Sequence, residues 1–446
     1  MAGYSKYKYS GFSWIGDIPE HWDIKRTKYV AKLYNGDSLN DEQKNAYSDF
    51  SESDETIPYI ASKDIDKDSC SVDYLNGTRI PKKEKNTNGR PFSKAPAGSS
   101  LLCIEGGSAG KKRCILDREV NFVNKLCCFV PKINGKFLFY YICSNSYWEN
   151  FKQNLQGMIG GVTVTKLGSF PIPIPSDNEQ KAIADYLDEE SSRIEKLIRT
   201  EERSVELLQE LKQTIITKAV TEGVDASAAL KDTGLQCVGR IPSHWELPKT
   251  LYVLEMPITD GPHETPKLFD DGIPFISAEA VSGGEIDFEQ KRGYISEEYY
   301  HECCKKYIPQ RDDIYMIKSG ATTGRIAMVK TDEVFTIWSP LAVFRADNKR
   351  ITPQFLFYAL MSDYYQRQVQ LNWSYGTQQN IGMRTLEKLK IALPPIDEQE
   401  KIVTEIVNRT QSLNEAIKKA KKQIDLLREY KQSLITEIVT GKQKIC

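Results

Sequence analysis

The stretch EQKAIADYLDEESSRIEKLIRTEERSVELLQELKQTIITKAVTEG, residues 179–223, decides the fold because the chain contains it twice. The second copy, EQEKIVTEIVNRTQSLNEAIKKAKKQIDLLREYKQSLITEIVTGK, occupies residues 398–442 at a constant offset of 219 and needs no gap. Identical pairs include Glu179/Glu398, Gln180/Gln399, Leu208/Leu427, Lys212/Lys431, Gln213/Gln432 and Thr217/Thr436. An internal repeat of this length predicts a chain made of two equivalent halves.

Each copy predicts one long helix. Apolar residues recur on a seven-residue beat over about five heptads, without an internal Pro or Gly, which is typical of a coiled coil. Some 40 residues at about 1.5 Å each would form a rod of roughly 60 Å. Because each copy has an apolar seam, we expect the two copies to bury their seams against each other. The predicted seam residues are Leu187, Ile194, Ile198, Val205, Leu208 and Ile215 in the first copy, and Ile406, Leu413, Ile417, Ile424, Leu427 and Leu434 in the second.

A shorter repeat opens each half of the chain. Residues 11–22 read GFSWIGDIPEHW and residues 234–245 read GLQCVGRIPSHW. The shared Pro fixes a turn and the shared Trp can anchor it, so we expect a domain to begin here in each half. The paired histidines, His21 and His244, are expected to pack and to form hydrogen bonds rather than to bind a ligand.

The segment behind each opening has a similar plan and a divergent sequence. IPYIASKDI (57–65) corresponds to IPFISAEAV (273–281) as a short strand, and the aromatic-rich residues 137–153 and 355–370 each predict a helix. We therefore predict an α+β chain with an internal pseudo-two-fold repeat. Two mixed α/β domains at residues 1–176 and 224–395 would alternate with two long helices at residues 177–223 and 396–446.

Composition sets the broad class of protein. A chain of 446 residues with a net charge of −1 is long enough for two or three domains. The sequence lacks an apolar run near the roughly 20 residues that span a membrane, and its N-terminus lacks the apolar core of a signal peptide. The ten cysteines show no C-x-x-C spacing, which favours reduced thiols. We expect a cytoplasmic protein without a metal site.

Several catalytic motifs are absent from the sequence. The Gly106–Lys112 stretch has the wrong glycine spacing for a phosphate-binding P-loop and lacks the hydroxyl that would bind magnesium. The chain also lacks G-x-S-x-G, H-E-x-x-H and the Asn/Asp-Pro-Pro-aromatic tetrapeptide of adenine methyltransferases. These absences predict a non-enzymatic chain.

Basic and amide side chains on glycine-rich loops are candidate DNA contacts. Lys and Arg on such loops suit phosphate contacts, and Gln can read an adenine edge. A basic loop can equally be a solvated surface, and a glycine-rich hairpin can simply be a tight turn. The candidates are Lys82, Lys83, Lys85, Arg90, Lys111, Lys112 and Arg113 in the first segment, and Lys318, Ser319, Thr322, Thr323, Arg325, Gln378 and Gln379 in the second, with Arg345 and Asn380 nearby in the sequence.

The combined pattern resembles the DNA-specificity (S) subunit of type I restriction–modification systems. The resemblance rests on the duplicated x-I-P-x-H-W opening, the two variable segments and the paired strand-to-helix junctions that end in Glu-Gln, and it spans nearly the whole chain. Cys237 stands where the first opening has Trp14, and the two glycine-rich turns differ in spacing by one residue. Contact residues therefore do not transfer from one half to the other.

The resemblance implies a function and a set of partners. Each variable segment would be a target recognition domain that reads one half of a split sequence in double-stranded DNA. The helices would form an antiparallel coiled coil that sets the spacer and docks two methyltransferase (M) subunits through the seam-bearing helices. Restriction and translocation (R) subunits would complete the complex. Adenine-N6 methylation and ATP-dependent cleavage would belong to the partners, so S-adenosylmethionine, ATP and Mg²⁺ would bind there, and this chain would need no cofactor.

Two other classes of function remain open from the residues alone. The chain could be a coiled-coil interaction scaffold without a DNA role, using its aromatic-rich helices as protein-binding faces. A single-chain restriction enzyme is the third class, and the missing methyltransferase and nuclease motifs disfavour it.

Overall fold

The computed structural model describes residues 3–47, 55–75, 77–156, 160–375 and 379–445, and it divides the chain into two compact units. Unit 1 comprises Met1–Glu202 and Lys421–Cys446, and unit 2 comprises Arg203–Ala420. Each unit contains one globular segment and a part of both long helices. The prediction of a mixed α/β chain is confirmed.

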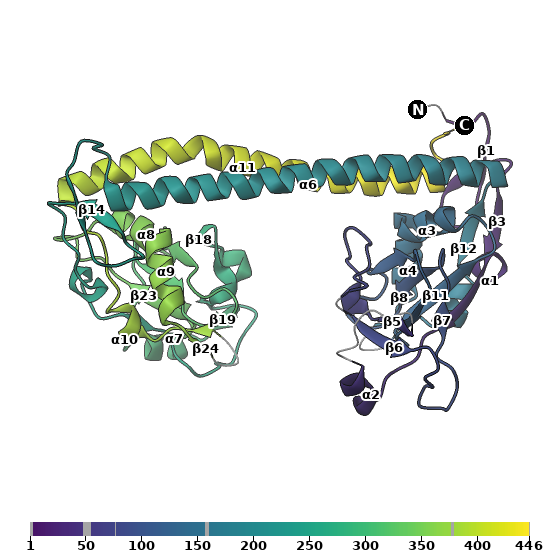
Figure 1. Ribbon diagram of the computed structural model, residues 1–446, viewed down its shortest axis with the longest axis horizontal. Coiled ribbons are helices and arrows are strands. Elements are labelled where there is room, and N and C mark those ends of the chain that lie inside the picture. Colours follow the sequence, from purple (N-terminus) through teal and green to yellow (C-terminus); the bar gives the residue numbers. More distant parts are fainter. Residues whose placement is uncertain (1–2, 48–54, 76, 157–159, 376–378, 446) are drawn as a thin grey trace. The chain divides into compact units, whose positions relative to one another are not determined.

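The two long helices are α6 (Asp177–Glu222) and α11 (Ile396–Val439), labelled in Figure 1. Both have acidic residues in their first turn, where the partial positive charge of the helix N-terminus stabilises them. A glycine in the left-handed region follows each helix, Gly223 with φ 74° and Gly441 with φ 73°. Glycine is the residue that adopts this conformation without steric cost, so it ends both helices.

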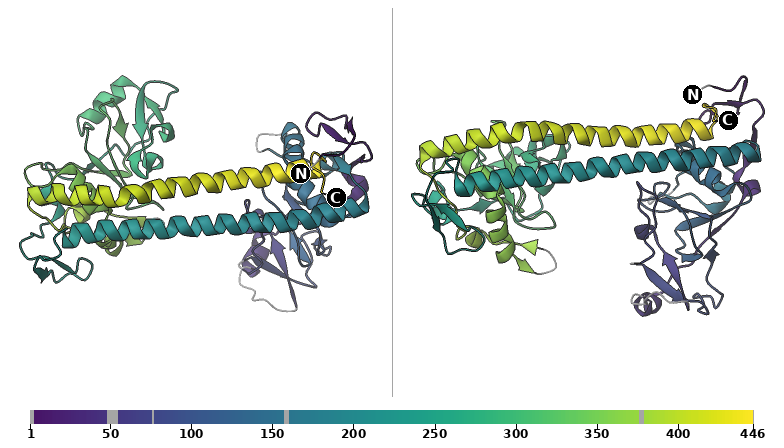
Figure 2. Two further views of the ribbon diagram at one scale, coloured as in Figure 1. Left: turned by 90° about the horizontal axis from the view of Figure 1, so that it is seen from above. Right: turned by 45° about the horizontal axis from the view of Figure 1, so that its top comes forward.

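Portions of both helices contribute to the core of each unit. In unit 1, Leu187 and Ile194 of α6 share a buried cluster with Leu434 of α11. In unit 2, Ile216 of α6 shares a cluster with Ile406 of α11. In unit 1 the start of α6 thus packs with the end of α11, and in unit 2 the end of α6 packs with the start of α11. Figure 2 shows these helix segments side by side. All twelve predicted seam residues are buried or half-buried.

The globular segment of unit 1 contains two four-stranded sheets. One sheet is antiparallel with the order β4-β11-β8-β9, and helix α3 packs on it (Figure 1). The other has the order β6-β5-β10-β7, in which β5 and β10 are parallel. The elements are β1 (Tyr7–Tyr9), β2 (Asp17–Pro19), β3 (Asp23–Arg26), α1 (Thr27–Val30), β4 (Ala31–Asn35), α2 (Asp41–Ala46), β5 (Thr56–Ile60), β6 (Thr78–Pro81), β7 (Lys94–Ala95), β8 (Ser100–Cys103), β9 (Arg113–Ile115), β10 (Val120–Phe122), β11 (Leu126–Pro131), α3 (Gly135–Cys143), α4 (Asn145–Gln153), α5 (Val164–Gly168) and β12 (Pro171–Ile174).

The globular segment of unit 2 also has two main sheets, but their numbers of strands differ from those in unit 1. Its six-stranded sheet has the order β15-β23-β20-β21-β18-β17, and a smaller sheet has the order β19-β16-β22 with β16 and β22 parallel. The elements are β13 (Leu230–Asp232), β14 (Arg240–Pro242), β15 (Thr259–Asp260), β16 (Ile273–Ile276), β17 (Val281–Ser282), β18 (Gly284–Ile286), β19 (Gly293–Ile295), α7 (Glu297–Cys304), β20 (Ile314–Ile317), β21 (Ile326–Met328), β22 (Thr336–Ile337), β23 (Leu341–Phe344), α8 (Pro353–Met361), α9 (Asp363–Asn372), β24 (Ser374–Tyr375), β25 (Gln379–Asn380) and α10 (Met383–Leu386).

One pair of glycines occupies an equivalent place in both segments. A Cβ atom on Gly36 would lie 1.8 Å from the carbonyl oxygen of Phe122, and one on Gly261 would lie 2.0 Å from that of Ile337. Neither distance leaves room for a side chain, so glycine is required where the first sheet strand approaches the parallel pair.

The predicted aromatic-rich helices are each divided in two. Ser144 separates α3 from α4 and Ser362 separates α8 from α9, both with extended backbone. Each serine hydroxyl donates a hydrogen bond to a carbonyl three residues earlier, at 2.7 Å in the first segment and 2.6 Å in the second. Local side-chain bonds of this kind compete with a continuous helix, which explains the break. Within the described part of the chain, no helix is long and apolar enough to cross a membrane.

Candidate nucleic-acid interface

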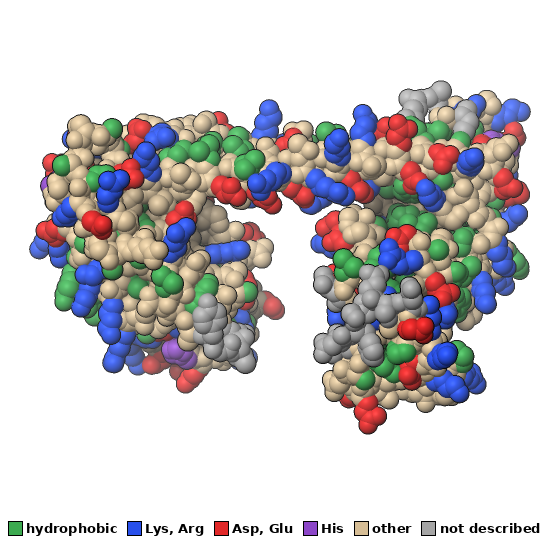
Figure 3. Space-filling view, viewed as in Figure 1, with side chains coloured by type: hydrophobic (Ala, Val, Ile, Leu, Met, Phe, Trp, Pro, Cys, Tyr) green, Lys and Arg blue, Asp and Glu red, His purple; other side chains and the backbone are tan. Residues whose placement is uncertain are grey.

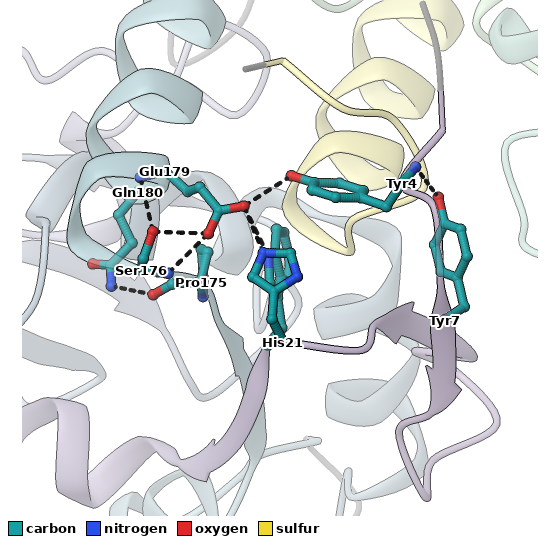
Figure 4. A network of polar contacts seen from close by, with 8 residues as sticks. Tyr4, Tyr7, His21, Pro175, Ser176, Glu179 and Gln180 are labelled. Atoms are coloured by element: carbon teal, nitrogen blue, oxygen red, sulfur yellow. Dashed lines mark hydrogen bonds and ion pairs between the residues drawn. The ribbon is translucent and has the colours of Figure 1, made fainter.

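The opening turn of each segment is fastened to the start of a long helix by a carboxylate. In unit 1, Glu179 contacts the His21 ring at 2.9 Å (Figure 4). It also accepts a bond from the Trp22 indole at 3.3 Å. In unit 2, Glu398 contacts His244 at 2.8 Å and Trp245 at 3.1 Å. The predicted hydrogen bonding of the paired histidines is confirmed, although both side chains are about half exposed, at 54% for His21 and 50% for His244.

Hydrogen bonds also fix the ionisation of the unit 1 carboxylate. Burial raises the pKa of Glu179, but bonds from His21, Ser176 and Trp22 outweigh it and lower that pKa to about 2. The Ser176 hydroxyl donates at 2.8 Å and caps the first turn of α6 (Figure 4). The negative charge is therefore part of the attachment.

The next residue of each helix holds the same segment at a second point. Gln180 accepts a bond from the Asn134 amide at 3.1 Å, next to the start of α3, and donates to the Pro175 carbonyl at 2.9 Å. In unit 2, Gln399 accepts from the Thr352 amide at 2.7 Å and donates to the Pro394 carbonyl at 3.0 Å. Both glutamines are almost fully buried.

The other helix of each unit holds the far end of α3 or α8. Gln432 of α11 donates to the Cys143 carbonyl at 2.7 Å, and Gln213 of α6 donates to the Met361 carbonyl at 2.7 Å. The hydroxyls of Thr436 and Thr217 accept bonds, both at 2.9 Å, from the Asn145 and Asp363 amides. Four of the six identical pairs named in the sequence analysis, Glu179/Glu398, Gln180/Gln399, Gln213/Gln432 and Thr217/Thr436, are thus the points that attach a globular segment. The sequence signalled these residues by their identity but did not reveal this role.

The candidate DNA residues of the first segment divide into exposed and engaged groups. Lys82, Lys83, Lys85, Arg90 and Lys111 are exposed. The other two candidates are engaged within unit 1. The ammonium of Lys112 donates to the Ser62 carbonyl at 2.7 Å, and the guanidinium of Arg113 donates to the Cys143 carbonyl at 3.2 Å.

The candidates of the second segment gather at one glycine-rich loop. The backbone amide of Ile381 donates to the carbonyl of Lys318 at 2.9 Å, and the backbone amide of Gly320 donates to the carbonyl of Gln379 at 2.9 Å. The Ser319 hydroxyl lies 3.3 Å from the Asn380 side chain. Arg325 is exposed, and Thr322 and Thr323 are half-buried. Gln378 lies outside the described residues. An equivalent contact in unit 1 joins Gly106 to Gly160 at 3.0 Å.

Two basic side chains of the second segment are neutralised inside the fold. The Lys318 ammonium lies 3.2 Å from the carboxylate of Asp260, which is fully buried and also pairs with Lys306. Arg345 binds Asp313 through two hydrogen bonds of 2.7 and 2.8 Å. Sequence reasoning missed both acids, because each lies far from its basic partner along the chain. No cluster of three or more His, Cys, Asp or Glu residues that could hold a metal was found in the described part of the chain.

The chain is similar to known proteins over most of its length. The family model described as "Type I restriction modification DNA specificity domain" matches residues 19–206 and 260–426. The MjaVIII specificity subunit of a type I restriction enzyme from Methanocaldococcus jannaschii is 24% identical over 96% of this chain and 94% of its own. The EcoBI specificity subunit from Escherichia coli is 23% identical over 87% of this chain and 79% of its own.

A solved structure supports the fold. A chain from a study of complex assembly and conformational transition in the type I R-M system superposes with a TM-score of 0.62 at 16% identity. The superposition covers 95% of this chain and 98% of that one.

Proposed function

This chain belongs to the family of type I restriction–modification DNA specificity domains, and from this premise we propose that it reads a bipartite DNA target, one half with each globular segment. The observation that supports this proposal is the repeated attachment. The same residue types, Glu, Gln, Gln and Thr, hold a globular segment in both units, while the segments themselves differ in sequence. Recognition of two different half-sites requires two globular segments that differ in sequence and are attached to the long helices in the same way.

We further propose that α6 and α11 form an antiparallel coiled coil that fixes the spacing between the two readers. All twelve predicted seam positions are buried or half-buried, as knobs-into-holes packing requires. In unit 1 the seam is bordered by ion pairs between the helices, Lys431–Glu195 at 2.6 Å and Arg428–Glu202 at 2.9 Å. A spacer of set length would leave the bases between the two half-sites unread.

The exposed basic loops would supply contacts to the DNA backbone. In unit 1 these are Lys82, Lys83, Lys85, Arg90 and Lys111, and in unit 2 the exposed cation of the glycine-rich loop is Arg325. Lys and Arg at loop positions bind phosphates without reading sequence, so they would position each segment on the duplex. Gln378, Gln379 and Asn380 are the side chains that we assign to adenine edges in the second segment. Ser319, Thr322 and Thr323 are further candidate DNA contacts of the glycine-rich loop, without an assigned base.

The chain would act without chemistry of its own. Two methyltransferase subunits docked on the long helices would carry adenine-N6 methylation and S-adenosylmethionine. Restriction subunits would carry ATP-dependent translocation and cleavage with Mg²⁺. This chain would then decide only where on the DNA the partners act.

Mapping of methylated adenine across the genome tests the proposal. Cells that contain the cognate methyltransferase are compared with and without the gene for this chain. We expect a bipartite motif that disappears on deletion and returns with the intact chain. An unchanged pattern of methylated adenine, with the methyltransferase shown to be active, would contradict the DNA role and favour an interaction scaffold.

A further inference from the structure

Two cysteines of unit 1, Cys70 and Cys143, line the same cavity beside the long helices. The cavity has a volume of about 620 Å³ and lies between the hairpin at residues 65–72, the end of α3 and the two helices. Cys70 is half-buried and Cys143 is buried. Charged side chains of the helices form one wall of the cavity, and Figure 3 shows such side chains along the helices. Lys67 and Arg199 also line the cavity and are exposed, so small polar molecules can enter it.

The hairpin that carries Cys70 has an equivalent in unit 2. The bridge between Ile65 and Val72 is antiparallel, like the pairing of β17 with β18. Both hairpins follow a corresponding strand, β5 or β16, and a short 3-10 turn. Cys70 precedes Val72 by two residues, as Gly284 precedes Ile286 at the end of β18. Both positions have a positive φ, 56° for Cys70 and 86° for Gly284.

The equivalent glycine shows where a side chain at this position points. A Cβ atom on Gly284 would lie 3.0 Å from the Cζ atom of Phe357 and 3.6 Å from the Cε atom of Met361. Met361 ends α8 as Cys143 ends α3, so the two residues are equivalent. The side chain of Cys70 therefore points to Cys143, in agreement with the cavity that they share.

The backbone of Cys70 is one that cysteine rarely adopts. Within the described part of the chain, Cys70 and Asp312 are the two residues other than glycine with a positive φ. A Cβ atom is sterically disfavoured in the left-handed region, and unit 2 has Gly284 at the equivalent position. Packing alone therefore does not explain a thiol here, because glycine would suit the backbone better.

The surroundings of Cys70 favour its thiolate. A hydrogen bond from the Cys143 thiol lowers the pKa of Cys70, and the charges of Arg113 and Lys431 lower it further, against the opposing effect of burial. Burial raises the pKa of Cys143. The Arg113 guanidinium donates to the Cys143 carbonyl at 3.2 Å, which places its positive charge beside the pair. Because the thiolate is the nucleophilic form of cysteine, Cys70 is the member of the pair that reacts first.

We propose that Cys70 and Cys143 form an oxidisable dithiol site whose substrate is a hydroperoxide. The Cys70 thiolate attacks one peroxide oxygen, so that an S–O bond forms, the O–O bond breaks, and the leaving oxygen takes a proton from solvent. The Cys143 thiol then attacks the Cys70 sulfur, an S–S bond forms, and the hydroxyl group leaves as water with the proton of Cys143. The peroxide is reduced, and the two thiols are oxidised to a disulfide.

The disulfide would tie the hairpin to the point at which α11 holds α3. Cys143 is the last residue of α3, and its carbonyl accepts a hydrogen bond from Gln432 of α11 at 2.7 Å. Across the hairpin, the Asp66 amide donates to the Ser71 carbonyl at 3.0 Å. A covalent link from the hairpin to the helix removes open conformations of the hairpin. Oxidation should therefore slow the hydrogen exchange of this hairpin.

The test treats the purified full-length chain with an equimolar amount of hydrogen peroxide and maps its thiols by mass spectrometry without reduction. We expect a Cys70–Cys143 crosslink that dithiothreitol reverses, with slower hydrogen exchange of residues 65–72 while the crosslink is present. Cys237 is the internal control, because it is also half-buried but packs on the apolar core of unit 2. Cys70 should react at least about tenfold faster than Cys237.

Two variants separate the roles of the cysteines. Cys70→Gly places in unit 1 the residue that unit 2 has at Gly284, so it should fold, form no crosslink and leave Cys143 reduced. Cys143→Ala should stop at the sulfenic acid of Cys70, which dimedone traps. Oxidation of Cys237 before Cys70 in the wild-type chain, or a sulfenic acid on wild-type Cys70 that never becomes a crosslink, would overturn the proposal. These two outcomes are measured on the wild-type chain, so they do not depend on the folding of either variant.

Discussion

At the scale of single residues, the two repeated carboxylates attach an opening turn to a long helix in each unit. The pKa of Glu179 is lowered from 4.5 to about 2 by its hydrogen bonds, in spite of the opposing effect of burial. A carboxyl group with a lowered pKa in the folded state stabilises the protein above its unfolded pKa. That contribution disappears as the pH falls from about 4.5 towards about 2.

We predict that Glu179→Gln removes this acid-sensitive contribution and weakens the attachment of the opening turn by about 1–3 kcal/mol at neutral pH. The measurement is hydrogen exchange of the Trp22 region between pH 3 and pH 7. Glu189→Gln, an exposed position ten residues further along α6, is the control. Equal exchange in Glu179→Gln and the wild-type chain at neutral pH would rule out the attachment role.

Arg345 and Arg325 allow a matched pair of substitutions in the second segment. Removing Arg345 would leave the carboxylate of Asp313, which is 1% exposed, without its bidentate partner. We expect Arg345→Ala to lower the free energy of unfolding of unit 2 by about 3–5 kcal/mol. Arg325 is exposed, so Arg325→Ala should leave stability unchanged within about 0.5 kcal/mol and weaken DNA binding. Urea unfolding and DNA titration separate the two effects, and a stable Arg345→Ala protein would contradict the structural role.

At the scale of elements, local patterns were predictable and long-range pairings were not. The heptads predict the long helices because each seam residue is three, four or seven positions from the next. The partners of Lys318 and Arg345 could not be found in this way, because Asp313 precedes Arg345 by 32 residues and Asp260 lies still further from Lys318. The serines that divide the aromatic helices did carry a local signal. Ser144 is a typical N-cap, and its hydroxyl accepts a bond from the Tyr147 amide at 3.2 Å.

The loop between β6 and β7 yields a prediction about DNA affinity. Lys82, Lys83 and Lys85 are all exposed there. We expect the triple alanine variant to bind every DNA sequence more weakly. The slope of log K against log salt should decrease by about 0.9 for each phosphate that the variant no longer neutralises. Lys181→Ala on α6 is the control and shows the effect of removing one lysine outside the loop. Titrations at several salt concentrations give the slope. Weaker sequence discrimination at unchanged affinity would show that the loop reads bases instead.

At the scale of the whole molecule, helix length should determine the length of the unread gap. One heptad inserted into both helices, after Glu202 and after Ala420, keeps the seam in phase and adds about 10 Å. At about 3.4 Å per base pair this corresponds to roughly three base pairs.

We therefore expect methylome mapping of the double-insertion variant to show the same two half-sites with a gap about three base pairs longer. Since one turn of DNA takes about 10 base pairs, the second half-site is also rotated around the duplex, and affinity should fall while the motif is kept. An insertion in one helix alone puts the two seams out of register, so it should abolish methylation rather than shift the gap. Altered half-sites in the double variant would show that the helices take part in reading bases, and an unchanged gap would show that they do not set the spacing.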